Sequence, residues 1–166
     1  MGGIIAREFT EKHEKKVRSV TIISSKVEDI IHGFTKLMIE QQDEVAGFNK
    51  SEALLLLFPY IYKEYEQAMK WFQHQRLYSK QSPEDSAVAS RALLETVNAN
   101  KEFTHNVEVP TLIINGRYDP IIRDKDHYEM EEHFRNVEKV LFEDSGHAPY
   151  VEEADRFLDL YLSFLE

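Results

Sequence analysis

Residues 109–120 are Val-Pro-Thr-Leu-Ile-Ile-Asn-Gly-Arg-Tyr-Asp-Pro. Within them, residues 111–115 form a short apolar run with β-branched side chains, and a glycine-containing loop follows. This pattern predicts a strand that is buried on both faces, as in a parallel sheet. The loop carries one carboxylate, Asp119, directly after the strand. Because the chemistry of open parallel sheets lies just beyond the carboxyl ends of the strands, Asp119 is a candidate site residue.

A second strand and loop of the same kind lie further along the chain. Residues 140–142 are Val-Leu-Phe, and Ser145, Gly146 and His147 follow them. A histidine in such a glycine-flanked turn can direct its ring to the end of a sheet. Alone, either the acid or the histidine fits an ordinary loop, but together they match the acid–base pair of a catalytic triad. We therefore predict that Asp119 orients the imidazole and that His147 is the general base.

The composition excludes several classes of protein. The chain has 166 residues, of which 42% are hydrophobic, and this is enough for one globular domain. Its net charge is −10 without a basic cluster, which argues against nucleic acid and membrane surfaces as partners. It has no cysteine, so disulfides and thiolate metal sites are excluded. Because we find no signal-peptide pattern and no membrane-spanning run, we expect a cytoplasmic protein.

Hydrophobic patterns divide the chain into three blocks and predict the α/β class. Residues 1–25 are expected to hold a helix and a first core strand at 17–23. Residues 26–104 are expected to form a helical cap insertion over the sheet. Residues 105–166 are expected to form the C-terminal core, with the acid loop, the histidine loop and a strand at 138–142. The sheet should therefore have about three parallel strands.

Local signals place further helices within these blocks. Residues 82–85, Ser-Pro-Glu-Asp, combine a capping hydroxyl, a proline and first-turn acids, which predicts a helix start. An acidic helix is predicted at residues 124–134, with Tyr128 and Phe134 facing inward, and the last helix at 152–165. The residues expected to be buried on the last helix are Ala154, Phe157, Leu158, Tyr161, Leu162 and Leu165.

Together these motifs resemble the C-terminal half of the α/β-hydrolase fold family. The family motif Pro-x-Leu-x-x-x-Gly-x-x-Asp, which supplies the triad acid, matches residues 110–119. The family motif Gly-His, which supplies the base, matches Gly146 and His147, and the closing helix has the family spacing from Glu152 to Phe157. The resemblance extends over the whole chain. It implies a serine hydrolase that cleaves an ester, amide or related bond through a Ser-His-Asp triad.

The start of the chain departs from the family pattern. Met1, Gly2 and Gly3 resemble the end of the nucleophile elbow Gly-x-Ser-x-Gly-Gly, so the serine would lie immediately before Met1. The resemblance thus implies that this chain lacks the nucleophile and that Met1 is a remnant of the oxyanion hole. We expect such a chain to be inactive alone. Alternatively, it is a non-catalytic binding fragment or one half of a two-chain hydrolase.

Other residues could replace the missing or assigned groups. Ser24, Ser25 and Ser145 lie at predicted strand ends, but such serines are usually turn formers, and none has an elbow with glycines on both sides. Glu28 and Asp29 follow the first strand, where some members of the family place the acid. Acids in the first turn of the next helix are the simpler interpretation. The acid and base assigned above are therefore kept.

The cap region contains a concentration of aromatic residues: Tyr60, Tyr62, Tyr65, Trp71, Phe72 and Tyr78. Helix packing alone would explain each of them. In the family the cap covers the substrate pocket, so they also fit a small apolar or acyl substrate if an N-terminal half completes the site. His127 and His133 lie near Asp124, Asp126 and Glu129, but a spacing of six puts the two rings on different helix faces. We expect no metal and no cofactor.

The position of the first predicted strand in the sheet indicates how the chain could associate with other chains. In the family, the strand that precedes the elbow lies against residues 17–23, so this resemblance implies an unpaired sheet edge. Natural edges carry charges, prolines or bulges, and Arg18 is the one charge within this strand. We therefore expect self-association through the 17–23 edge, or pairing with an N-terminal half.

Overall fold

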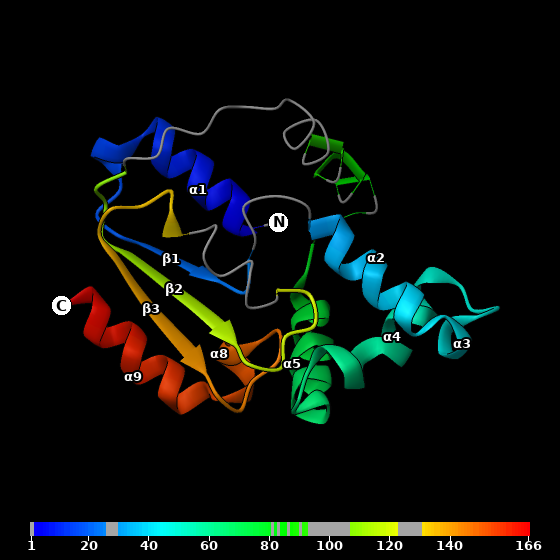
Figure 1. The fold of residues 1–166 in the computed structure, drawn as a ribbon. Helices are drawn as coiled ribbons and strands as arrows, with labels where there is room; N and C mark the ends of the chain where they lie inside the picture. The colour runs from blue at the N-terminus through cyan, green and yellow to red at the C-terminus, as the bar shows by residue number, and fades with distance from the viewer. Residues whose placement is uncertain are drawn as a thin grey trace.

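The computed structural model describes residues 2–25, 30–80, 82, 84–85, 87–89, 91–92, 107–122 and 131–166. Helices and strands alternate in the core, and several helices separate the first strand from the second (Figure 1). In chain order the elements are α1 (Gly2–Lys12), the 3-10 helix η1 (Glu14–Lys16), β1 (Val20–Ile23), α2 (Ile30–Glu40), α3 (Gln42–Val45), α4 (Lys50–Ile61), α5 (Tyr65–Tyr78), β2 (Thr111–Gly116), β3 (Val137–Phe142), α8 (Pro149–Glu152) and α9 (Ala154–Leu165). Among the described residues, no helix combines the length and the apolarity needed to cross a bilayer.

The three strands form one sheet in the order β1-β2-β3, and both pairs are parallel. This confirms the predicted α/β class and the three parallel strands. Val20 lies opposite Thr111, and Thr111 lies opposite Val137. β2 is buried at every position, as a central strand with both faces covered must be.

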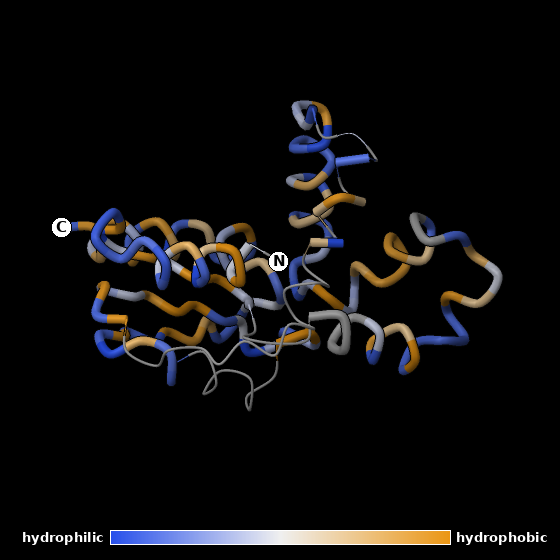
Figure 2. The backbone as a smooth tube through the Cα atoms, turned by 90° about the horizontal axis from the view of Figure 1, so that it is seen from above, coloured by the Kyte–Doolittle hydropathy of each residue, from blue (hydrophilic) through white to orange (hydrophobic). Residues whose placement is uncertain are grey.

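Helices cover the two faces of the sheet, with α1 on one side and α9 on the other (Figure 1). Successive side chains of a strand point to opposite faces, so Ile113 packs with Ile22 in the cluster that α1 contacts. Leu112 and Ile114 pack on the other face, where Phe157 of α9 meets them. The strand segments are largely hydrophobic, whereas the helices alternate between hydrophobic and hydrophilic residues (Figure 2). The sheet therefore supplies the centre of the core.

β1 begins at Val20, so the predicted strand start at residue 17 is wrong. The N–H of Val17 instead donates to the carbonyl of Glu14 at 3.0 Å and closes the η1 turn. The chain segment before β2, the partner of β1, also prevents β1 from starting earlier. The N–H of Val20 donates to the carbonyl of Pro110 at 2.9 Å, and Pro110 has no N–H with which to extend the ladder backwards.

The predicted buried stripe of the last helix is correct for Phe157 and wrong for most of its other residues. Phe157, Leu160 and Phe164 face the sheet, whereas Leu158 and Leu162 are about half exposed. Ala154 and Leu165 are also exposed, and Tyr161 is half-buried. The helix has two neighbouring apolar rows, and the bulkier row with two phenylalanines occupies the sheet face. The predicted start is also wrong, because α8 ends at Glu152 and α9 begins at Ala154.

The predicted acidic helix at residues 124–134 lies mostly outside the described residues, as does Tyr128. Phe134 is buried, as predicted, but it is not helical. It forms an isolated parallel bridge with Val107, and the N–H of Arg135 donates to the carbonyl of Val107 at 2.9 Å. Pairing beside the sheet therefore replaces the last helical turn.

Helices α2 to α5 lie between β1 and β2 in the chain and beyond the carboxyl ends of the strands (Figure 1). This is the position expected of a cap, although the three block boundaries stay a prediction. The helix start predicted at residues 82–85 has its reciprocal cap. The N–H of Asp85 donates to Oγ of Ser82 at 3.1 Å, and the N–H of Ser82 donates to Oδ2 of Asp85 at 3.0 Å.

We expect the chain to self-associate through the outer edge of β1, which has no strand partner within the described residues. Because Val20 and Ser24 donate their N–H groups towards β2, the N–H of Thr21 points outward. Thr21→Pro should weaken association about tenfold by removing one edge donor, while Thr21→Val should leave association unchanged. Sedimentation velocity at micromolar concentration measures the association. A wild-type chain that remains monomeric would show that the edge is covered.

Candidate active site

The loops that follow β2 and β3 are in backbone contact. The N–H of Tyr118 donates to the carbonyl of Ser145 at 3.0 Å. Gly116 permits this approach, because a Cβ at this position would lie 2.5 Å from the carbonyl oxygen of Ser145 and closer still to that of Gly146. The two loops therefore hold their side chains at fixed positions relative to each other.

This contact brings Asp119 and His147 together, which confirms the predicted contact. Nδ1 of His147 lies 2.7 Å from Oδ2 of Asp119, whose side chain is fully buried. Oδ1 of Asp119 accepts the N–H groups of Ile121 at 2.8 Å and Ile122 at 3.1 Å. The carboxylate is thus oriented from two sides, and it favours the imidazole tautomer that carries the proton on Nδ1.

The second ring nitrogen of His147 is available for chemistry. The His147 side chain is 29% exposed, and Nε2 has no hydrogen-bond partner among the described residues. With the proton on Nδ1, Nε2 carries the lone pair of the neutral ring. The pair can therefore take a proton from a group presented at Nε2.

The end of α4 meets the histidine loop. The N–H of His147 donates to the carbonyl of Ile61 at 3.0 Å, and the ring of Tyr62 lies 6.5 Å from the imidazole, centre to centre. Burial raises the pKa of Tyr62, and neighbouring acidic groups, Asp119 among them, raise it further. Tyr62 therefore presents a neutral hydroxyl and an apolar ring beside the imidazole.

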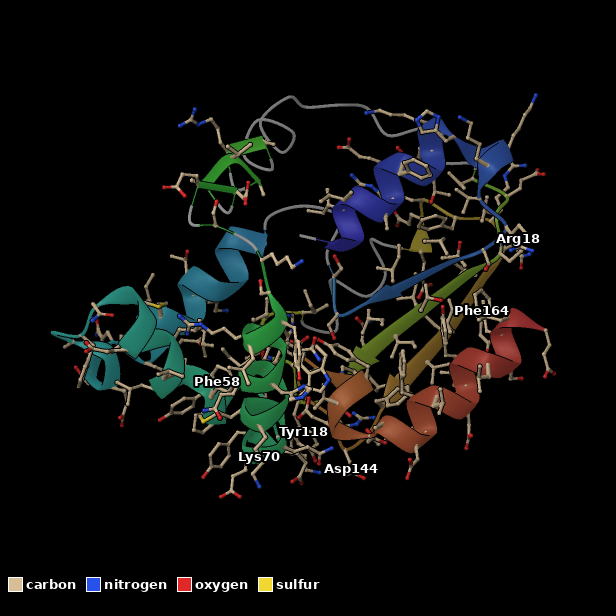
Figure 3. All side chains as sticks on the ribbon, turned by 180° about the vertical axis from the view of Figure 1, so that it is seen from behind. Arg18, Phe58, Lys70, Tyr118, Asp144 and Phe164 are labelled. Atoms are coloured by element: carbon tan, nitrogen blue, oxygen red, sulfur yellow. The ribbon has the colours of Figure 1, made fainter. Side chains whose placement is uncertain are left out.

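Lys63, in the linker between α4 and α5, contacts both strand-end loops. Its ammonium pairs with Asp144 and lies 4.6 Å from the centre of the Tyr118 ring. The hydrogen bond to Asp144 raises the pKa of Lys63 and lowers that of the carboxyl. Figure 3 shows Tyr118 and Asp144 at the same end of the sheet, beside helices α4 and α5, which carry Phe58 and Lys70.

None of the alternative serines hydrogen-bonds to His147 in the described part of the chain. Oγ of Ser145 donates to a neighbouring glutamate carboxylate at 2.6 Å. Ser25 packs against the first turn of α1, where a Cβ on Gly3 would collide with its hydroxyl. Ser24 has a φ of 43° and a buried hydroxyl. No bonded nucleophile–base pair is present among these residues.

Several predicted candidates lie outside the described residues, namely Met1, Glu28, Asp29 and His127. Of the two histidines considered for a metal, His133 is described: it is buried, with Nδ1 4.0 Å from Oε1 of Glu11. Within the described ranges, no group of three or more histidine or acidic residues could hold a metal ion. The oxyanion role of Met1, the alternative acids and the absence of a metal and a cofactor all stay predictions.

A pocket of about 450 Å³ lies between α4 and α5. Its apolar lining includes Leu54, Leu55, Phe58, Tyr62, Met69 and Phe72. Two of the six cap aromatics singled out in the sequence, Tyr62 and Phe72, therefore face a cavity. Trp71 instead packs against Tyr150, with the ring centres 5.3 Å apart. Tyr62 is the lining residue whose ring also contacts the imidazole, and neither Asp119 nor His147 lines the pocket.

Comparison with known proteins decides the family. The model of the family described as the alpha/beta hydrolase fold matches residues 1–154 of the sequence. The chain belongs to the α/β-hydrolase fold family. Lipase 1 of Psychrobacter immobilis is 24% identical over 175 residues, which cover 99% of this chain and 53% of the lipase.

Two further comparisons agree with this α/β-hydrolase assignment. The pimeloyl-(acyl-carrier protein) methyl ester esterase of Neisseria meningitidis serogroup C is 24% identical over 183 residues, which cover 100% of this chain and 67% of the esterase. The solved structure of Est816, described as an N-acyl homoserine lactone degrading enzyme, matches with a TM-score of 0.69 at 19% identity. That match covers 98% of this chain and 64% of Est816. The α/β-hydrolase chain thus spans about half to two thirds of the length of these relatives.

In this α/β-hydrolase chain, sequence reasoning missed a role for Glu152. The sequence places Glu152 at the start of the last helix, where acids are ordinary. Its carboxylate instead accepts the N–H groups of Gly146 and Ala148, which flank His147. The sequence does contain a signal for this role. Glu152 lies three residues after Pro149, which follows the histidine loop.

The contact between the two loops can be tested at Gly116. We expect Gly116→Ala to lower the free energy of unfolding by about 3 kcal/mol, because backbone oxygens occupy the space that a Cβ needs. Gly2→Ala is the control, since no atom lies within 4 Å of a Cβ there, and it should not lower stability. Urea unfolding followed by circular dichroism gives both values. Equal stability of the two variants would contradict the loop contact.

Proposed function

We propose that this chain is the acid–base half of a serine hydrolase that cleaves carboxylic esters. The observation that carries the proposal is the 2.7 Å contact between His147 and Asp119, which follow neighbouring parallel strands. Membership of the α/β-hydrolase family and the lipase and esterase relatives support the choice of reaction. The site thus combines a fixed acid with a base that has one free nitrogen.

In this mechanism His147 acts first as a base and then as an acid. Nε2 takes the proton of a serine hydroxyl while the serine oxygen attacks the ester carbonyl carbon. Asp119 holds the Nδ1 proton and stabilises the imidazolium that forms. The imidazolium then gives its proton to the departing alkoxide, which leaves an acyl-enzyme. The same nitrogen then takes a proton from water as the water oxygen attacks the acyl carbon. The imidazolium returns this proton to the serine oxygen as the acyl–serine bond breaks and the carboxylic acid leaves.

We propose that the nucleophile comes from outside these 166 residues. None of the described hydroxyls of Ser24, Ser25 and Ser145 is bonded to His147, and the lipase and esterase relatives extend well beyond the matched region. The resemblance of Met1 and the following glycines to the end of a nucleophile elbow supports a serine supplied by another segment. On this proposal the chain alone is inactive, and an N-terminal half completes both the triad and the oxyanion hole.

An apolar acyl group is the part of the substrate that we assign to the cap. The pocket of about 450 Å³ between α4 and α5 has an apolar lining, and a cavity of this size accommodates a small organic ligand. Tyr62 lines the pocket and its ring contacts the imidazole, which supports this pocket as the place for an acyl chain. The absence of cysteine supports a cytoplasmic location.

Serine-directed labelling tests the proposed function. The gene is expressed together with its upstream DNA, with an affinity tag at the C-terminus of this chain, and the purified material is treated with a fluorophosphonate. We expect the label on a serine outside these 166 residues, together with hydrolysis of nitrophenyl esters. His147→Ala should lower turnover by about 10⁶ and Asp119→Asn by about 10⁴.

The chain expressed by itself is the control, and it should show no hydrolysis above buffer. A label on a serine within the chain would refute an external nucleophile. Hydrolysis that survives His147→Ala would refute the assigned base. Absence of label in both preparations would favour a non-catalytic binding fragment.

A further inference from the structure

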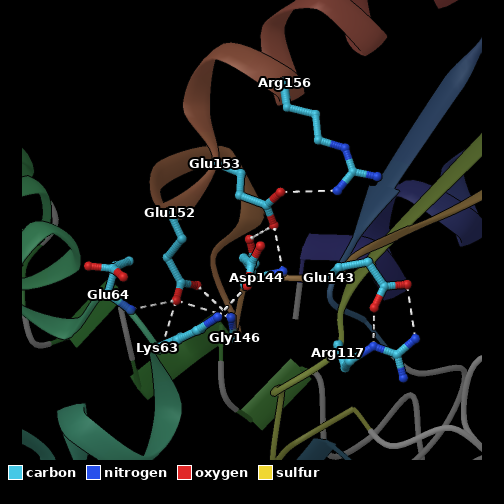
Figure 4. Close-up of polar contacts among 10 residues, drawn as sticks. Lys63, Glu64, Arg117, Glu143, Asp144, Gly146, Glu152, Glu153 and Arg156 are labelled. Carbon is cyan, nitrogen blue, oxygen red and sulfur yellow. Dashed lines mark hydrogen bonds and ion pairs between the residues drawn. The ribbon is translucent and has the colours of Figure 1, made fainter.

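Glu152, the last residue of α8, has an unusual set of hydrogen-bond donors. Its carboxylate accepts four main-chain N–H groups from two separate segments. Figure 4 shows the bonds from Lys63, Glu64 and Gly146. From the histidine loop, Gly146 donates to both oxygens at 3.0 Å and Ala148 donates to Oε2 at 3.0 Å. From the linker after α4, Lys63 and Glu64 donate to Oε1 at 2.6 and 3.1 Å. One side chain thus joins the base loop to the cap.

The charge of Glu152 suits this arrangement. The residue is buried, and within the described residues it has no cationic partner, since the ammonium of Lys63 pairs with Asp144 instead. A buried carboxylate is stable when several N–H groups solvate it, and hydrogen bonds to a charged acceptor are stronger than neutral ones. A glutamine in its place would keep one acceptor oxygen, but its NH₂ group would replace the other. That NH₂ group is itself a donor and cannot accept the main-chain N–H groups. The site therefore suits a side chain with two acceptor oxygens.

The two segments that Glu152 joins also touch each other directly. A Cβ on Gly146 would lie 2.5 Å from the carbonyl oxygen of Ile61 and 3.0 Å from Cα of Tyr62. The N–H of His147 donates to the same carbonyl of Ile61 at 3.0 Å. Each of the three consecutive N–H groups from Gly146 to Ala148 is therefore bonded, and the middle one belongs to His147. Glu152 supplies the bonds on both sides of the base.

We propose that Glu152 is a positioning residue, which holds His147 in line with Asp119 and fixes the cap linker in register with the base. The inference rests on the proposed function, because a fixed base matters only if His147 transfers protons. It assigns Glu152 no contact with the substrate. Loss of its carboxylate would release Gly146 and Ala148, and the imidazole would lose its fixed distance from Asp119.

The neighbouring Glu153 provides a matched control. It lies next to Glu152 in the chain, and its Oε2 accepts the N–H of Asp144 at 3.1 Å and the hydroxyl of Ser145 at 2.6 Å. Glu153 thus bonds the same loop, but it does not bond the residues that flank His147. A role limited to loop stability predicts similar effects of Glu152→Gln and Glu153→Gln. A positioning role predicts an effect on the imidazole for Glu152→Gln alone.

The imidazole tautomer separates the two roles. The full chain, labelled with ¹⁵N-histidine, is studied by long-range ¹H–¹⁵N NMR, and the signals of His147 are those that His147→Ala removes. We expect one tautomer in the wild type, with the proton on Nδ1. In Glu152→Gln the ratio of Nδ1–H to Nε2–H forms should fall by about tenfold, the equivalent of one lost hydrogen bond to a charged group. Glu153→Gln should keep the wild-type ratio.

The tautomer ratio is the deciding measurement, because it reports directly on the contact between Nδ1 of His147 and Asp119. An unchanged ratio in a folded Glu152→Gln variant would overturn the proposal. If that variant does not fold, amide hydrogen exchange of the wild type decides. The amides of Lys63, Glu64, Gly146 and Ala148 should be protected together, and exchange at the rate of open loops would overturn the proposal.

These measurements do not depend on activity, so the two proposals can fail separately. If the fluorophosphonate labels neither preparation, the hydrolase function is refuted and the tautomer result remains intact. An unchanged tautomer ratio would refute the role of Glu152 and leave the acid–base pair in place.

Discussion

Carboxylates that accept main-chain N–H groups hold together the loops at the carboxyl end of this sheet. Where β2 and β3 end, the loop amides lose their ladder partners, and an unpaired buried amide is costly. Asp119 accepts two such amides after β2, and Glu152 and Glu153 accept those of the loop after β3. The chain is acidic overall, with a net charge of −10. In this region, hydrogen bonds to acidic side chains take the place of backbone hydrogen bonds between strands. The position of the imidazole depends on these acidic side chains.

Much of the fold and the centre of the site could be predicted from local sequence. The apolar run before Asp119 forms the centre of a buried strand, and the run before His147 forms its parallel neighbour. Parallel strands bring their carboxyl ends to one edge, so the two loops meet there. The reciprocal cap of Ser82 and Asp85 was predictable for a similar reason, since a capping box involves only residues three apart.

The remaining features depend on partners that are distant in the sequence. The start of β1 is set by Pro110, about ninety positions away, and not by the apolar residues that precede Val20. The orientation of α9 is set by competition between two apolar rows for one sheet face, which a helical periodicity alone does not resolve. Glu152 escaped prediction because its donors come from two separate loops, and a glutamate near a helix start carries no sign of them. Contacts of this kind become visible only when the chain is folded.

The exposed apolar rows on the two helices that flank the sheet affect the fate of the chain in a cell. Ile5 and Phe9 of α1 and Leu158, Leu162 and Leu165 of α9 are each about half exposed or more. Chaperones and proteases recognise exposed apolar segments, and they act fastest on chains that open often. A chain that presents these rows to solvent has a lifetime set by how soon they are covered. Its cellular abundance would then follow the supply of whatever covers them more closely than its own rate of synthesis.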